Sequence, residues 1–181
     1  MLKRIWLALA LAIVAGCASS DSPPKAPALQ NLAPNEGYVL LSVSTNIGLA
    51  SISVNGPKRL FFTKDDLKTN STYLLVAAPA GDYSFAEVNF VGMYRRDMTD
   101  DEVAFSVEAG KINYVGHLSI ESIYSDGSAG IVFLSNKGSE GFKFMQEKFP
   151  ELLKGHSMRY AGQGDDFFFP FIQPLVQGAK P

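Results

Sequence analysis

The strongest constraint on the fold is a two-residue alternation of apolar and polar side chains, which recurs along the chain and is longest at 112–124. The apolar members of this run share one face of an extended strand: Ile112, Tyr114, Leu118, Ile120 and Tyr124. The polar members share the other face: Asn113, His117, Ser119 and Glu121. Alternation of this kind predicts a β-strand with one buried face and one solvated face.

Similar patterns predict eight strands in all, at 38–44, 50–54, 59–63, 72–78, 83–91, 102–108, 112–124 and 129–134. Turns such as Asn55-Gly56-Pro57 and Asp126-Gly127 separate them. Segment 129–134 is apolar on both faces, which predicts a place in the interior of a sheet. Seven or eight short strands that do not alternate with helices predict a mainly β fold, an antiparallel β-sandwich of the Ig-like kind.

One helix is expected after the strands, at about 139–154. Ser139 is a suitable N-cap, and Phe142, Met145 and Phe149 follow at helical spacing. Pro150 either closes this helix or opens a new turn. The folded domain therefore covers about 36–160 and ends with this helix.

The tail, 161–181, is rich in aromatic residues and proline. It carries Phe167, Phe168, Phe169 and Phe171, and prolines at 170 and 174 argue against a regular helix or a central strand. Two interpretations stay open. The tail folds back as a strap over the sandwich, or its phenylalanines dock onto a partner, because exposed apolar patches mark interfaces.

The first 16 residues have the layout of a secretory signal peptide. Lys3 and Arg4 precede an apolar run of about a dozen residues, whereas a bilayer-spanning helix needs roughly 20. Small residues then lead directly into Cys17, the single cysteine of the chain. An unpaired cysteine in an exported chain is open to oxidation, and acylation removes that difficulty.

The segment Val14-Ala15-Gly16-Cys17 resembles a bacterial lipobox, in which the thiol of the cysteine is acylated and the preceding peptide is removed. The resemblance implies a membrane anchor on Cys17. Ala18 and Ser19, rather than aspartate, follow the cysteine, which by the same resemblance implies the outer membrane and its periplasmic side, with surface exposure left open. Segment 17–35, rich in Ser, Pro and Ala, is expected to be an extended tether.

Composition excludes several classes of protein. The 181 residues are 46% hydrophobic and 19% charged, which is typical of a folded domain and not of a disordered chain. Sixteen basic and 18 acidic residues give a formal charge of −2, which argues against nucleic-acid binding. Two histidines and one cysteine leave little for a metal site, and no metal or cofactor is predicted.

Three short motifs resemble those of small bacterial lipoproteins with a transthyretin-like, or carboxypeptidase-regulatory-like, β-sandwich. Segment 78–83, Ala-Pro-Ala-Gly-Asp-Tyr, is similar to their P-x-G-x-Y turn, in which the glycine permits the turn and the tyrosine faces the core. Segment 107–116 is similar to the element that opens their long strand, and segment 149–152 to their terminal helix. The resemblance implies a fold and a location but no catalytic residue, since most members have no assigned function.

Candidates for chemistry are few. His117, Ser119 and Glu121 combine the residue types of a hydrolase triad. On one strand, however, they stand roughly 6.5–7 Å apart at each step, beyond hydrogen-bond reach. No G-x-S-x-G motif is present, and His117 is expected to be a surface imidazole. No catalytic residue is therefore predicted.

The polar stretch 93–101 is either a solvated hairpin loop or a contact loop. In the second interpretation Tyr94, Arg95 and Arg96 contact a partner, because tyrosine and arginine are favoured at interface hot spots. Taken together, the sequence predicts a non-enzymatic binding or assembly module of the bacterial envelope, with another envelope protein as its partner. The alternative is a small envelope hydrolase or carbohydrate-processing enzyme.

Overall fold

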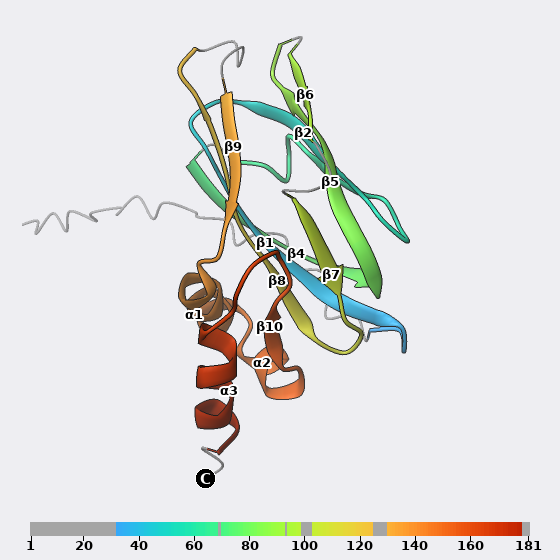
Figure 1. The fold of residues 1–181 in the computed structure, drawn as a ribbon, viewed down its shortest axis with the longest axis vertical. Coiled ribbons are helices and arrows are strands. Elements are labelled where there is room, and N and C mark those ends of the chain that lie inside the picture. The colour runs from blue at the N-terminus through green and yellow to red at the C-terminus, as the bar shows by residue number, and fades with distance from the viewer. Residues whose placement is uncertain (1–31, 69, 93, 99–102, 125–129, 179–181) are drawn as a thin grey trace, which may run out of the picture.

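The computed structural model describes residues 32–68, 70–92, 94–98, 103–124 and 130–178. The predicted signal peptide 1–16, the predicted lipidation site Cys17 and most of the predicted tether 17–35 lie outside these residues. The described part of the chain forms two five-stranded sheets and three helices (Figure 1).

The first sheet is built around β8, which has neighbours along both of its edges. Its strands are β1 (Glu36–Thr45), β4 (Asn70–Pro79), β8 (Ile112–Ser122), β9 (Gly130–Ser135) and β10 (Met158–Tyr160). β1 pairs with β4 on one side and β8 on the other, while β9 and β10 pair with β8. β9 and β10 use different parts of β8, its second half and its first residues respectively.

The second sheet is antiparallel throughout its described pairs and is built around β2 and β5. Its strands are β2 (Leu49–Asn55), β3 (Leu60–Thr63), β5 (Gly81–Phe90), β6 (Arg95–Asp97) and β7 (Ala104–Val107). β2 pairs with β3 and β5, and both β6 and β7 pair with β5.

All eight segments expected to be strands are strands, and the fold is mainly β, with two sheets and mostly antiparallel pairing. Two points differ from the expectation. The described residues contain ten strands, because β6 and β10 have only three residues each, too few to show an alternation. In addition, β8 runs parallel to β1 and β10. Hairpins force consecutive strands to be antiparallel, but β1 and β8 are joined by a long path through the second sheet, which leaves their direction free.

The two sheets enclose a common apolar core. Val39, Leu41 and Val43 of β1 and Val103, Phe105 and Val107 around β7 belong to it, as their alternation predicts. Tyr83 is 2% exposed in the same core and donates a hydrogen bond from its hydroxyl to the carbonyl of Pro79, 2.9 Å away. Gly81, with φ of +140°, makes the turn by which the chain leaves the first sheet for the second.

A β-bulge at Gly116 reverses the faces of β8 partway along the strand. The register with β1 passes from Tyr114 to Gly116 and skips one residue. As a result Ile112 and Tyr114 face away from the sandwich core, whereas Leu118 and Ile120 lie in it. The sequence placed all four on one face, which is wrong, because an inserted residue shifts a two-residue alternation by one.

The three helices gather at one end of the molecule and cover part of the outer face of the first sheet (Figure 1). They are α1 (Gly138–Lys148), α2 (Pro150–Gly155) and α3 (Phe168–Gly178). A second apolar cluster, here called the helical cluster, joins them to the sheet. Its buried members are Tyr38, Leu40, Leu75, Ile112, Tyr114, Phe142, Met145, Leu152, Met158, Tyr160 and Phe169.

Two helical expectations need correction. The helix expected at 139–154 is divided into α1 and α2, since Pro150 opens a new helix. Ser139 does not cap it: α1 begins at Gly138, whose N–H donates to Oδ1 of Asn136 at 2.9 Å.

The tail is a helix, contrary to the expectation from its two prolines. Asp166 caps α3, because its Oδ1 accepts hydrogen bonds from the N–H groups of Phe168 and Phe169 at 3.1 and 3.2 Å. Pro170 lies in the first turn, where a missing N–H costs nothing. Pro174 lies inside the helix, which therefore loses one internal hydrogen bond there but is held by packing on the helical cluster.

Candidate functional site

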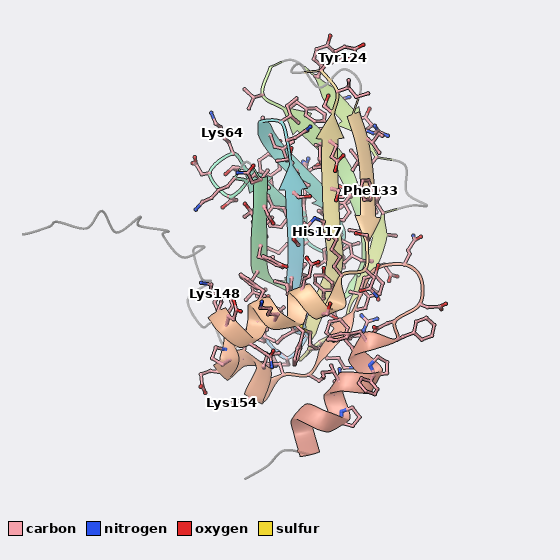
Figure 2. All side chains as sticks on the ribbon, turned by 90° about the vertical axis from the view of Figure 1, so that its left-hand side faces the viewer. Lys64, His117, Tyr124, Phe133, Lys148 and Lys154 are labelled. Atoms are coloured by element: carbon pink, nitrogen blue, oxygen red, sulfur yellow. The ribbon has the colours of Figure 1, made fainter. Side chains whose placement is uncertain are left out.

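The outer face of the first sheet is covered by helices at one end and carries mostly polar side chains beyond them. α1 crosses the lower part of this face, and above it the described helices leave the strands uncovered (Figure 2). Phe144 of α1 stacks on Tyr73 of β4 with ring centroids 4.1 Å apart, which marks the boundary. Beyond the boundary the outward side chains form two rows across the four strands, here called the polar rows. They are Ser71, Ser44, Ser119 and Phe133 in one row, and Tyr73, Ser42, His117 and Ser135 in the other.

His117 stands at the centre of the polar rows (Figure 2) and bridges two serines of the neighbouring strand. Its Nδ1 lies 2.9 Å from Oγ of Ser42, and its Nε2 lies 2.8 Å from Oγ of Ser44. Ser44 continues the chain to Oγ of Ser119 at 3.4 Å. At the other end, burial raises the pKa of the Tyr73 phenol and its interaction with Ser42 lowers it. Four side chains from two strands, β1 and β8, thus form one connected chain of hydrogen bonds.

The surroundings of His117 favour its neutral form. Burial lowers the pKa of its imidazole, the nearby Lys137 lowers it further, and Glu140 raises it. The side chain is 7% exposed, so the expectation of a surface imidazole is wrong. The bulge at Gly116 turns His117 toward the face of the sheet that carries the helices. The serines beside it belong to β1, and Ser42 lies 75 residues before it in the sequence.

A serine and a histidine within hydrogen-bond distance are the first two members of a nucleophilic site. The third position, next to Nδ1, is taken by the hydroxyl of Ser42 and not by a carboxylate. A neutral imidazole can accept a hydrogen bond from one serine hydroxyl while its N–H donates a hydrogen bond to the other. Without a carboxylate beside it, however, the imidazolium form is not stabilised as it is in a Ser-His-Asp triad. Among the described residues no group of three or more His, Cys, Asp or Glu side chains is arranged to hold a metal ion.

β9 borders the polar rows and presents an apolar surface. Its outward residues Ile131 and Phe133 are 62% and 45% exposed, while Val132 and Leu134 pack against the sandwich core. β9 pairs with β8 on one edge, and no described strand pairs with its other edge. The expectation that 129–134 lies in a sheet interior is therefore wrong over the described residues, because alternation reports the faces of a strand and not its edges.

The predicted contact residues Tyr94, Arg95 and Arg96 lie in and beside β6, a short strand and not a loop. Tyr94 is 48% exposed. Arg95 forms ion pairs with Glu87 and Asp97 at 3.6 and 3.1 Å, so its charge is already paired. Arg96 donates a hydrogen bond to the carbonyl of Gly130, which brings this segment to the beginning of β9.

The predicted aromatic contact residues are divided by α3. Phe169 is 1% exposed and Phe168 packs beside it on the helical cluster, so these two hold the tail to the body. Phe167 and Phe171 point outward and are 82% and 69% exposed. The tail is therefore held to the body through one side of α3, as the strap interpretation predicts. That Phe167 and Phe171 contact a partner stays a prediction.

The structure brings β6 close to β9 but places the phenylalanines of α3 at the opposite, helical end (Figure 1). The reasoning from sequence did not identify the serines of β1 or the exposed pair on β9. A signal existed for the serines, since Ser42 and Ser44 occupy alternate positions of an apolar strand. Their approach to His117 depends on strand pairing, which no local pattern reveals.

No family model, curated protein or solved structure matches this chain. Among the described helices, none combines the length and the apolar character needed to cross a bilayer. The site is therefore interpreted from its own geometry.

Proposed function

We propose that this protein is a non-enzymatic binding module, anchored through an acylated Cys17 at the outer membrane and facing the periplasm. In this proposal the open edge of β9 binds an extended segment of another envelope protein. The observation that carries the proposal is the combination, on one strand, of an edge without a described partner and two exposed apolar side chains.

An edge strand offers a row of backbone N–H and C=O groups that another chain can pair with, and proteins usually guard such edges with charges, proline or bulges. β9 has the sequence Gly-Ile-Val-Phe-Leu-Ser and contains neither a charged residue nor proline. Its pairing with β8 is continuous over six residues. Apart from the hydrogen bond of Arg96 to the carbonyl of Gly130 at the beginning of β9, no described charged residue guards this edge, which supports a strand-addition mode of binding.

The outward side chains would supply specificity. A strand added beside β9 places alternate side chains on the outer face, next to Ile131 and Phe133, where apolar residues would be favoured. The long edge of β4 is less suitable, since its outward residues Tyr73 and Leu75 already pack against the helices. The partner is thus expected to contribute a short extended segment with apolar residues at every second position.

A photoreactive benzoylphenylalanine at position 131 of the full chain tests this proposal in cells. Irradiation should yield one discrete protein adduct, and Phe133→Lys should abolish it by guarding the edge. Phe61→Lys is the matched control, because Phe61 is 55% exposed on the edge strand β3 of the other sheet. Absence of a discrete adduct, or an adduct that survives Phe133→Lys but not Phe61→Lys, would overturn the assignment.

The anchor is tested separately. Metabolic labelling with an alkyne fatty acid should mark the chain, and Cys17→Ser should remove the label. An unlabelled chain would count against the lipid anchor without affecting the assignment of β9.

A second candidate function, a small envelope hydrolase, is favoured by the contact between Ser44 and His117. In such an enzyme Nε2 of His117 would take the proton of Ser44 as the serine attacks an ester carbonyl. A fluorophosphonate probe should then label the wild-type chain and not the Ser44→Ala variant. Failure to label is the outcome expected for the binding module.

The relationship to transthyretin-like lipoproteins is also a proposal. It is supported by the turn at Gly81, with its positive φ, and by the burial of Tyr83 in the core, both of which the resemblance implies.

A further inference from the structure

The exposed residues of α3 whose side chains the structure describes are apolar: Pro170, Phe171 and Pro174. From Phe167 to Gly178 the sequence contains no Asp, Glu, Lys or Arg. The helix rests on the body through Phe168, Phe169 and Ile172, and this contact directs Phe167 and Phe171 away from it. Phe167, which directly precedes α3, and Phe171 within it form an apolar surface of the kind that marks a contact with a partner or a membrane.

The chain that leads to Cys17 reaches the body at the same end. Leu32, the first described residue, packs against the helical cluster, as do Phe168 and Ile172 of α3. The chain between positions 17 and 32 can span at most about 50 Å, given ~3.3–3.6 Å for each extended residue. An acyl chain on Cys17 would therefore be joined to the body at the helical end, which favours this end as the one that faces the bilayer.

We propose that the helical end of the domain faces the membrane and that Phe167 and Phe171 insert into the lipid interface beside the anchor. This inference rests on the lipid anchor of the proposed function and adds an orientation to it. Phe171 lies on a helix without charged residues, which suits the boundary between headgroups and acyl chains, and the carboxylates of Asp165 and Asp166 beside Phe167 would stay at the level of the headgroups. The tether supplies proximity, so the two side chains need only a weak affinity of their own.

This orientation agrees with the placement of β9. In Figure 1 the helices occupy one end of the molecule, and β9 begins at the opposite end and runs toward α1. With α3 on the membrane, the beginning of β9 and the neighbouring β6 point into the periplasm, where a partner can reach them.

The test places benzoylphenylalanine at position 171 of the full chain in cells, with position 61 as the matched exposed control. After irradiation, mass spectrometry should find a phospholipid adduct at position 171, at least about tenfold more abundant than at position 61. Substitution at either position leaves the core intact, since Phe171 and Phe61 are 69% and 55% exposed.

Each outcome of this experiment either supports or overturns the membrane-facing orientation. A phospholipid adduct enriched at 171 supports the inference. A protein adduct at 171, or an acylated chain with no lipid enrichment there, overturns the membrane-facing orientation. Labelling of Cys17 is measured in the same samples, so the loss of the anchor, which belongs to the proposed function, is distinguished from the loss of the α3 contact.

Discussion

A Cβ atom added to Gly116 would lie 3.0 Å from the carbonyl oxygen of Ser135. The backbone of Gly116 has φ of +132°, a conformation that side chains disfavour, and the bulge at this residue decides which face each half of β8 presents. One glycine thus makes it possible for Tyr114 to join the helical cluster while Leu118 joins the sandwich core.

Gly116→Ala should therefore destabilise the fold by about 3 kcal/mol, through backbone strain and overlap with β9. The free energy of unfolding in urea measures this. Gly155→Ala is the control, since a Cβ there meets nothing within 4 Å, and it should stay within about 0.5 kcal/mol of wild type. Equal stability of the two variants would show that the bulge does not require glycine.

His117 should make stability depend on pH between 7.5 and 5. Burial holds the pKa of its imidazole below the ordinary value of 6.5, so the unfolded chain binds the proton more readily than the folded one. The free energy of unfolding should then decrease as the pH falls below about 6.5. His117→Gln should cost about 1 kcal/mol at pH 7.5 and show a smaller loss on acidification. Parallel urea titrations at both pH values check this, and an unchanged slope in the variant would contradict it.

Asn113 organises the turn before β8 and should be sensitive to substitution. The side chain is fully buried: its Nδ2 donates to the carbonyls of Tyr38 and Glu108 at 3.1 and 3.0 Å, and its Oδ1 accepts from the N–H of Glu108 at 3.0 Å. Asn113→Ala leaves these backbone groups without partners and should cost about 3 kcal/mol. Asn113→Asp should not rescue stability, because a carboxylate cannot donate to the two carbonyls. Thermal unfolding of both variants provides the measurement.

Phe169 and Phe171 are two residues apart on α3, and their truncation should lower the stability of the fold by very different amounts. Phe169 is 1% exposed and meets the ring of Tyr114 with centroids 6.2 Å apart. Phe169→Ala should destabilise by about 3–4 kcal/mol, whereas Phe171→Ala, at an exposed position, should change stability by less than about 0.5 kcal/mol. Chemical denaturation separates the two, and similar losses would mean that both sides of α3 are packed.

Asp166 should control the order of α3 by capping it. Asp166→Ala removes the acceptor for the N–H groups of Phe168 and Phe169 and should cost about 1 kcal/mol, whereas Asp166→Asn keeps an acceptor oxygen. Hydrogen exchange of the amides at the start of α3 reports this locally. Exchange should accelerate in the alanine variant and remain close to wild type in the asparagine variant.

Local sequence patterns predicted the strands and helix α1 far better than they predicted which residues pack against each element. Alternation identified all eight longer strands and helical spacing identified α1, because the period of apolar residues follows directly from backbone geometry. The tail was misjudged for a related reason. Two prolines weaken a helix in isolation, yet the cap at Asp166 and the burial of Phe169 compensate in the folded chain.

The candidate site was largely beyond prediction. Ser42 and His117 are 75 residues apart and meet only because β1 and β8 pair in parallel. Ile131 and Phe133 are exposed because the described helices do not cover this part of the outer face (Figure 2), and the edge position of β9 among the described strands depends on how the strands are ordered in the sheet. Edge position and strand order are properties of the assembled sheet, and no period in the sequence encodes them.

By itself, then, the sequence determined the eight longer strands, the turns between them and helix α1, since those elements depend on neighbouring residues along the backbone. Only the tertiary structure decided which strands pair, on which face of the sheet His117 lies after the bulge at Gly116, and which apolar residues of β9 and α3 remain exposed. Those features arise from contacts between distant segments, whose free energy is realised only when the two sheets and the helical end pack together.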